Sequence, residues 1–500
     1  MSRSARGFGR GGPWAGRQRI RTVRRGVSAV LLAALLAGCG RVSDADVGFV
    51  AKWTETHYAL ARAERLSPPV ASRVTAYAAI ALYEGWARGS DSLQSLAGQV
   101  TGLESLPAPE TDDPLDRALV ALEAQTVVLR GMYQGGFPST DVAIVALHDS
   151  LLAVRTEAGV DEKMKTRSIQ YGARLGAAIL SWADGDGFRT RVLSFTPGKA
   201  PADWVPTSAE NQYRSQNLSA QTDVVFPANP TGKADSGALG SERSLTVNRP
   251  KTPASVNTPT INPTAALEPG WGAMRPFALR QVDDCRAPDP VPFSADSGSA
   301  FYQEAAEIYR LGNEQTEEQK AIAYFWADNP GESGTPAGHW LSVLAGLARQ
   351  WHLSPERAVE AYALTAIAVA DGFIGSFRAK YETNLLRPET YINRYLDKNW
   401  RPLLISPPFP TYTSAHSTQS AAAAEVLTAL FGDNRGYDDA THVLLGHPPR
   451  HLESFRHAAD EAGRSRWYGG IHYPMDHRAG QVQGRCIGAA VLANIKTRVP

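Results

Sequence analysis

The chain has 500 residues, of which 43% are hydrophobic and 20% are charged, as in an ordinary globular protein. Its formal net charge of +1 gives no overall attraction to nucleic acid, so no nucleic-acid partner is expected. A chain of this length exceeds what one hydrophobic core usually organises, and we therefore expect two or more structural units.

Residues 1–39 predict an export signal. An arginine-rich stretch from Arg3 to Arg25 precedes the apolar run Val27 to Ala37, which is too short for a permanent transmembrane helix. Leu36-Ala37-Gly38-Cys39 resembles the bacterial lipobox, in which Cys39 would be lipidated and become the mature N-terminus. In the alternative, an ordinary signal is cleaved and Cys39 is incidental. We expect a lipoprotein anchored in the outer membrane or at the cell surface, facing the periplasm or the exterior.

Residues 46–190 predict a helical bundle. Ser67-Pro68-Pro69 is typical of a helix start, because serine caps the first free N–H groups and proline is tolerated in the first turn. Apolar residues then recur at helical spacing. The bundle offers few candidate catalytic residues, so we interpret it as a scaffold.

The composition changes between 191 and 297, where Pro, Ser and Thr are frequent. Within this linker, residues 208–264 hold only the aromatics Tyr213 and Phe226, and they predict a disordered insertion. Besides Cys39 the chain contains Cys285 and Cys486, which in an exported protein could form a disulfide or remain two buried thiols.

Helical patterning resumes at 298 and continues to 500. Ser354-Pro355 starts a long helix whose apolar stripe extends to Leu385, and His339 before it is expected to serve as a structural hydrogen-bonding residue. No unbroken apolar stretch of about 18 residues follows residue 40, so no transmembrane helix is expected. The chain is predicted to be all-α, with two packed helical bundles.

Three short motifs in the C-terminal bundle carry the candidate chemistry. Lys380 and Arg387 are seven residues apart, a spacing that places both on one helix face, and Pro388 would end that helix. Thr413-Ser414-Ala415-His416 precedes an evident helix. Its N–H groups and the positive end of the helix dipole would favour an anion there.

The third motif runs from Ser465-Arg466 to His472 through a pair of glycines that allow a tight turn. Asp476 follows His472 by four residues, and its carboxylate would accept from the second ring nitrogen and fix the tautomer. His477 beside it is expected to be exposed.

The order and spacing of these motifs resemble the superfamily of vanadium-dependent haloperoxidases and type-2 phosphatidic acid phosphatases, in its bacterial haloperoxidase-like branch. The resemblance implies that Lys380, Arg387 and Arg466 neutralise an oxyanion, and that the Ser414 hydroxyl and the Ala415 N–H donate to it. His472 would bond vanadium or phosphorus, with Asp476 behind it, and His416 would act as acid–base. Ala415 replaces the glycine that is usual in this family, and its Cβ narrows the pocket.

The preferred interpretation is a vanadium-dependent haloperoxidase, which would hold vanadate and oxidise a halide with hydrogen peroxide to hypohalous acid. Phe409 is a candidate apolar wall for the halide. The alternative is an acid phosphatase that hydrolyses a phosphoester through a phosphohistidine, without a cofactor. A lipid-anchored binding protein with a dead site is disfavoured, because every charged and histidine position of the motifs is present. The sequence leaves the halide or phosphoester open.

Overall fold

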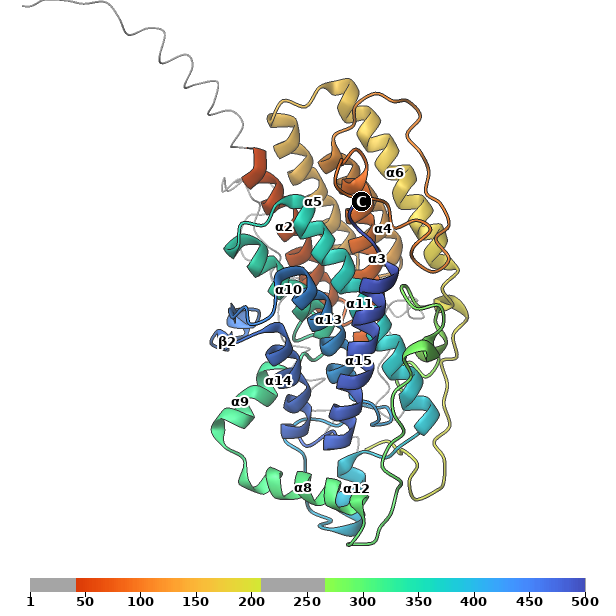
Figure 1. Ribbon diagram of the computed structural model, residues 1–500, viewed down its shortest axis with the longest axis vertical. Coiled ribbons are helices and arrows are strands. Elements are labelled where there is room, and N and C mark those ends of the chain that lie inside the picture. The colour runs from red at the N-terminus through yellow and green to blue at the C-terminus, as the bar shows by residue number, and fades with distance from the viewer. Residues whose placement is uncertain (1–41, 208–265, 500) are drawn as a thin grey trace, which may run out of the picture. The chain divides into compact units, whose positions relative to one another are not determined.

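The structure is a computed structural model, and it describes residues 42–207 and 266–499. The expected export signal with Cys39 and the expected insertion at 208–264 lie outside the described residues. From Asp46 onward, contacts along the described chain group it into one compact unit. Figure 1 gives the order of its elements by colour.

The described residues are mostly helical, which confirms the predicted all-α class. The helices of the N-terminal half are α2 (Val42–Ala63), α3 (Pro68–Ala87), α4 (Arg117–Met132), α5 (Pro138–Glu157) and α6 (Glu162–Asp184). Short 3-10 helices follow at η1 (Phe188–Thr190), η2 (Trp271–Ala273) and η3 (Val282–Cys285). The helices of the C-terminal half are α8 (Ala300–Glu314), α9 (Glu317–Phe325), α10 (Thr335–Gln350), α11 (Pro355–Thr383), α12 (Pro388–Tyr395), α13 (Ala415–Phe431), α14 (Phe455–Tyr468) and α15 (Pro474–Asn494).

A small antiparallel ladder packs beside α10 and α14. Strand β1 (Tyr437–Asp439) pairs with β2 (Arg450–Leu452), and the 3-10 helix η4 (Val443–Leu445) lies between them. Strands of three residues are too short to produce an alternating pattern, which is why the sequence did not indicate them.

Serine caps start the helices that the sequence predicted. The Ser67 hydroxyl accepts from the N–H of Val70 at 3.4 Å, and the Ser354 hydroxyl accepts from the N–H of Arg357 at 3.2 Å. A proline follows each cap at a position where its missing N–H costs no hydrogen bond.

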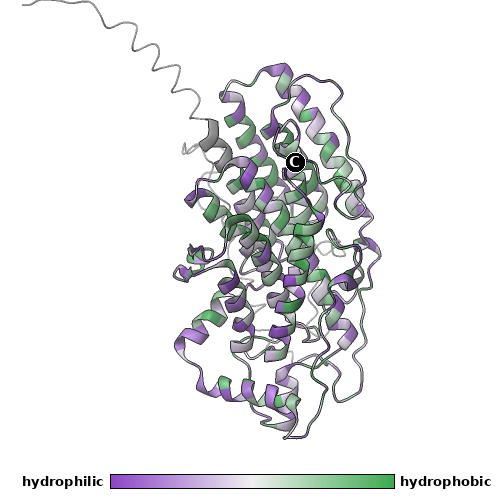
Figure 2. Ribbon diagram, in the orientation of Figure 1, coloured by the Kyte–Doolittle hydropathy of each residue, from purple (hydrophilic) through white to green (hydrophobic). Residues whose placement is uncertain are grey.

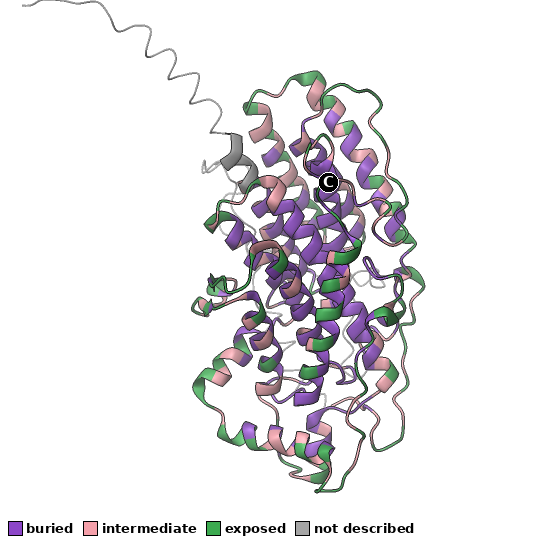
Figure 3. Cartoon of the chain, in the orientation of Figure 1, coloured by how far each residue is buried: buried purple, intermediate pink, exposed green. Residues whose placement is uncertain are grey.

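The two bundles meet on α11. This helix packs against α3 of the N-terminal bundle and against α13 and α15 of the C-terminal bundle. Apolar positions gather in the middle of the fold (Figure 2), where residues are buried (Figure 3). By length and composition α11 is the one helix within the described ranges that could cross a membrane. Its most apolar window is wholly buried inside the protein, as in a core helix.

Two long-range connections close the fold. A disulfide joins Cys285 at the end of η3 to Cys486 in α15, with the Cα atoms 5.7 Å apart, which resolves the pairing that the sequence left open. Residues 497–499 lie against the N-terminal bundle: the N–H of Gln94 donates to the carbonyl of Thr497 at 3.0 Å, and the N–H of Val499 donates to that of Ser92 at 3.1 Å.

Candidate active site

Lys380 and Arg387 do not share one helix, contrary to the prediction. Helix α11 ends at Thr383, because Asn384 adopts a left-handed conformation with φ of 47° and donates its N–H to the Lys380 carbonyl. Arg387 is instead the residue that precedes α12, in an extended conformation. Both side chains are nevertheless fully buried, and both contact the loop of residues 409–413.

The Lys380 ammonium is enclosed by this loop. It donates to the carbonyls of Pro410 at 3.2 Å, Thr411 at 2.9 Å and Thr413 at 2.6 Å. Burial, together with the charge of Arg387, holds the pKa of Lys380 well below its ordinary value. Lys380 therefore shapes the loop that leads into α13, and it would have to exchange one carbonyl to bond a ligand directly.

The Arg387 guanidinium has one donor left over. Its Nε donates to the carbonyl of Phe409 at 2.8 Å, while Nη1 donates to the carbonyl of Ile471 at 2.9 Å and to Nε2 of His472 at 3.0 Å. Nη2 is buried and has no hydrogen-bond partner among the described residues. Burial lowers the pKa of Arg387 to about 9, which still leaves it charged at neutral pH. A buried donor without an acceptor is costly, so this position favours an anion.

His472 is oriented from behind by Asp476, as predicted. Its Nδ1 lies 2.8 Å from Oδ2 of Asp476, the same oxygen to which the Thr411 hydroxyl donates. Because Arg387 can only donate, Nε2 must be the acceptor, and the ring proton is assigned to Nδ1. Burial and the charge of Arg387 hold the pKa of His472 well below its ordinary value. The Nε2 lone pair therefore accepts from Arg387, which would have to release it before His472 could bond a ligand.

The predicted helix start at Ser414 is confirmed. Ser414 precedes α13, and its hydroxyl accepts from the N–H of Ser417 at 3.4 Å. Ala415 is the buried first residue of the helix. The backbone N–H of Ser414 donates to the carbonyl of Asp476 at 3.1 Å, so the starts of α13 and α15 are joined directly.

His416 and Arg466 share one acceptor. Nε2 of His416 lies 3.0 Å from the carbonyl oxygen of Trp326, and Nη1 of Arg466 donates to the same oxygen at 3.2 Å. A carbonyl can only accept, so Nε2 of His416 carries the proton and Nδ1 holds the lone pair. Burial and the Arg466 charge hold the pKa of His416 well below its ordinary value. Burial also lowers the pKa of Arg466, to about 10.

Phe409 lies against the cations rather than apart from them. Its ring centroid is 5.0 Å from Nζ of Lys380 and 4.8 Å from Cζ of Arg387. An aromatic face attracts a cation, and in a buried site it does so without adding a counter-charge. The positive charge therefore remains available to a ligand.

Two contributors escaped the sequence analysis. Thr411, which bonds Asp476, lies in a loop without a helical or strand pattern. The Trp326 carbonyl is a backbone group, and no residue type signals it. His339, in contrast, was expected to be a structural hydrogen-bonding residue, and it is hydrogen-bonded to Asp328 and Asp439 in a buried cluster against Trp326. The expectation that His477 is exposed is wrong: it is buried, within 3.0 Å of the Ser417 hydroxyl.

Comparison with known proteins shows which sequences and folds this chain is similar to. The family model described as the VCPO second helical-bundle domain matches residues 395–499. The crystal structure of the first bacterial vanadium-dependent iodoperoxidase is similar with a TM-score of 0.72 and 32% sequence identity, covering 91% of this chain and 96% of that chain.

Two further structures share the fold at low identity. They are the holo-type bacterial vanadium-dependent chloroperoxidase, with a TM-score of 0.58 and 15% identity over 87% of this chain and 94% of that one, and the apo-type, with 0.56 and 14% over 86% and 94%. No curated protein sequence matches the chain significantly. Identity of 32% sustained over nearly the whole length of the iodoperoxidase goes beyond a common fold. The chain therefore belongs to the superfamily of vanadium-dependent haloperoxidases and type-2 phosphatidic acid phosphatases, within its bacterial haloperoxidase-like branch.

Proposed function

We propose that this protein is a vanadium-dependent haloperoxidase, which oxidises a halide with hydrogen peroxide at a vanadate held by His472. One observation carries the proposal: the unprotonated Nε2 of His472 faces the buried Arg387, whose Nη2 has no acceptor among the described residues. A neutral ring nitrogen is a metal ligand, and an unpaired guanidinium donor beside it suits the oxygens of an oxyanion.

The surrounding residues fit a tetrahedral oxyanion. Arg387 and Arg466 would neutralise its charge. Lys380, beneath the loop of residues 409–413, would add to the electrostatic attraction for the anion. The Ser414 hydroxyl and the Ala415 N–H, at the positive end of α13, would donate to it. When bound, vanadate supplies the Lewis-acid centre at which hydrogen peroxide becomes an oxidant for halide.

His416 is proposed as the acid–base group. Because Nε2–H is engaged by the Trp326 carbonyl, Nδ1 is the nitrogen that can take a proton. The lowered pKa keeps the ring neutral and able to accept. Phe409 is proposed as the apolar wall beside the halide, since it lies against both Lys380 and Arg387.

An acid phosphatase is the second candidate, because the same neutral Nε2 of His472 could attack phosphorus, and Asp476 behind it would stabilise the charge that develops on the ring. Purified protein separates the two. Halide oxidation by peroxide that appears on adding vanadate, and that phosphate suppresses by competition, supports the haloperoxidase. Phosphoester hydrolysis that vanadate only inhibits, without halogenation at any vanadate concentration, contradicts it and supports the phosphatase.

We also propose that the protein is exported and lipid-anchored through Cys39, on the basis of Leu36-Ala37-Gly38-Cys39 alone. Cys39→Ala should move the protein from the membrane fraction to the soluble fraction of the cells that export it. Equal membrane attachment of the variant would show that lipidation of Cys39 does not anchor the chain.

A further inference from the structure

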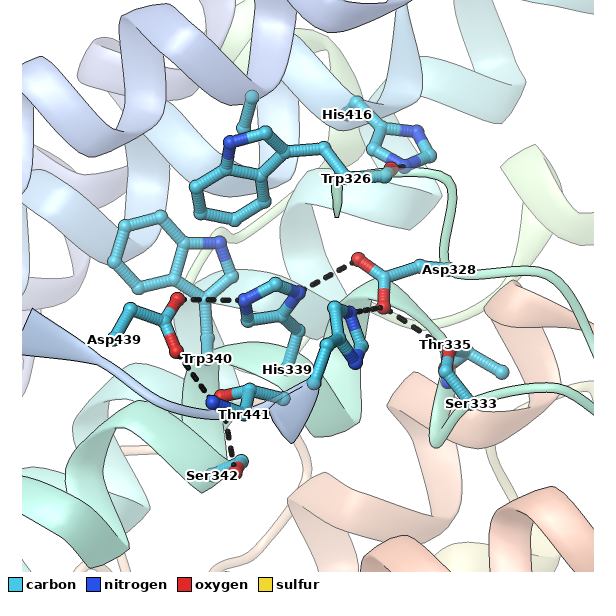
Figure 4. A network of polar contacts seen from close by, with 12 residues as sticks. Trp326, Asp328, Ser333, Thr335, His339, Trp340, Ser342, His416, Asp439 and Thr441 are labelled. Atoms are coloured by element: carbon cyan, nitrogen blue, oxygen red, sulfur yellow. Dashed lines mark hydrogen bonds and ion pairs between the residues drawn. The ribbon is translucent and has the colours of Figure 1, made fainter. Parts of the chain in front are cut away.

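A second buried polar cluster lies next to the candidate active site (Figure 4). His339 in α10 stands between two carboxylates: Nδ1 is 2.8 Å from Oδ2 of Asp328, and Nε2 is 2.8 Å from Oδ2 of Asp439. An ionised carboxylate only accepts hydrogen bonds, so both ring nitrogens carry protons. Burial alone would lower the pKa of His339, but Asp328 and Asp439 outweigh it and raise that pKa to about 10. His339 is therefore an imidazolium at neutral pH.

The polar atoms of this cluster have hydrogen-bond partners within the protein. The second oxygen of Asp328 is paired with Nε2 of His442 at 3.1 Å and accepts from the Ser333 hydroxyl at 3.0 Å. The possible ligand atoms of Asp328, His339 and His442 lie within 4.8 Å of one another, a spacing that also suits a cation. However, the two imidazoles face different oxygens of Asp328, and both nitrogens of His339 are used as donors. The protein groups thus satisfy one another without a metal.

The cluster is connected to the active site through Trp326. The His339 ring stacks on the Trp326 indole, with centroids 4.4 Å apart and planes 14° apart, and the indole Nε1 donates to Glu461 at 2.9 Å. An imidazolium on an indole face adds electrostatic attraction to the packing. These two contacts fix the side chain of the residue whose carbonyl receives both His416 and Arg466.

We infer that His339 is a positioning residue for this site: held between Asp328 and Asp439, it orients Trp326 so that its carbonyl keeps His416 in the tautomer with the proton on Nε2. This inference rests on the proposed role of His416 as acid–base. In that tautomer the Nδ1 lone pair is the one that can take a proton. If Trp326 is released, the proton can occupy either nitrogen, and only part of the molecules is competent.

The test compares His339→Gln with a control variant, Asp186→Asn, in which a buried carboxylate outside this cluster is replaced. Asp186→Asn breaks the buried ion pair of Asp186 with Arg73, 2.6 Å long, in the N-terminal half, and it controls for lost stability. The protein is labelled with ¹⁵N-histidine and kept free of vanadate. Long-range ¹H–¹⁵N correlation NMR then reports the tautomer of His416, and the signal that disappears in His416→Ala is assigned to that residue. Vanadate affinity and the kcat of halide oxidation are measured on the same samples.

In wild type and Asp186→Asn, His416 should show one tautomer, protonated at Nε2. In His339→Gln both tautomers should appear, and kcat should fall about 10-fold or more, as for other groups that orient a functional histidine, with vanadate affinity within about threefold. If His339→Gln does not fold, Asp439→Asn should shift the tautomer in the same direction, because it keeps the His339 ring but weakens its support.

A single Nε2–H tautomer in these variants, or a kcat no lower than that of Asp186→Asn, overturns the inference. So does a stoichiometric divalent metal in the purified protein that His442→Ala removes. The tautomer is observed without vanadate or halide, so the two proposals fail separately: a wild type that oxidises no halide but shows the expected tautomer change refutes the proposed function and supports the positioning role.

Discussion

The two histidines of the candidate site differ in what each ring nitrogen contacts, and this difference separates their functions. His472 presents a lone pair to Arg387 and has Asp476 behind it, whereas His416 is fixed by a carbonyl. His472→Ala should abolish tight vanadate binding, because the atom that bonds the oxyanion is lost. Titration calorimetry measures this binding. His416→Ala should still bind vanadate but lose turnover by about 10²–10⁴-fold. Equal loss of binding in both variants would contradict this division.

The imidazolium of His339 should also appear in the pH dependence of stability. Its pKa is raised from 6.5 to about 10, so its contribution to stability is fully present below about pH 6.5 and is lost as the pH rises through about 10. The difference in melting temperature between wild type and His339→Gln should therefore shrink between about pH 7 and pH 10. Thermal unfolding at several pH values measures it, and a constant difference would mean that His339 is neutral in the folded protein.

The packing of α15 on α13 depends on glycines at every fourth position, Gly480, Gly484 and Gly488. A Cβ at Gly484 would lie 2.1 Å from the carbonyl oxygen of Thr418 and 2.7 Å from Cβ of Ala421, so the helices would have to separate. These helices carry Ser414 and Asp476 at their starts. Close approach of the two backbones is therefore what brings the two halves of the site together.

Gly484→Ala should lower the free energy of unfolding by about 1–3 kcal/mol through overpacking and should weaken vanadate binding as well. The matched control is Gly346→Ala in α10, where a Cβ would meet nothing within 4 Å. That variant should be stabilised by about 0.5–1 kcal/mol, because alanine is the better helix former. Urea unfolding of both variants tests the comparison, and a Gly484→Ala protein as stable as Gly346→Ala would contradict it.

The helices were predictable where local chemistry decides them. Ser67 and Ser354 cap helices, and the four-residue spacing of His472 and Asp476 places them in contact, which the sequence indicated. The prediction that Lys380 and Arg387 share one helix was wrong, because Asn384 ends α11 by adopting a backbone conformation that spacing does not specify.

Long-range partners were not predictable. The carbonyl of Trp326 carries no residue signature, and the two carboxylates that hold His339 come from different parts of the chain, Asp439 from a strand of three residues. Asp328 lies in the loop that precedes α10, and Asp439 lies in β1. Only the packing of α10 against both of these segments brings the three groups together. Spacing rules within one element cannot detect such contacts.

Across the molecule, the disulfide Cys285–Cys486 links the segment between the bundles to the helix that carries Asp476. Replacing both cysteines by serine should lower the free energy of unfolding by about 2–5 kcal/mol, because the long closed loop no longer restricts the unfolded chain. Urea unfolding with and without a reducing agent measures the effect. Reduced wild type should approach the double variant, and an unchanged midpoint after reduction would show that the link adds no stability.

Residues 497–499, the last that the structure describes, lie against the N-terminal bundle, where the hydroxyl of Tyr83 also donates to the carbonyl of Thr497 at 3.0 Å. The first bundle to leave the ribosome is therefore completed by a segment synthesised after every site residue. When only α2 to α6 have been synthesised, the chain still lacks these contacts. It also lacks α11, on which α3 packs. The N-terminal bundle therefore gains its full set of contacts only once α11 and residues 497–499 have been synthesised.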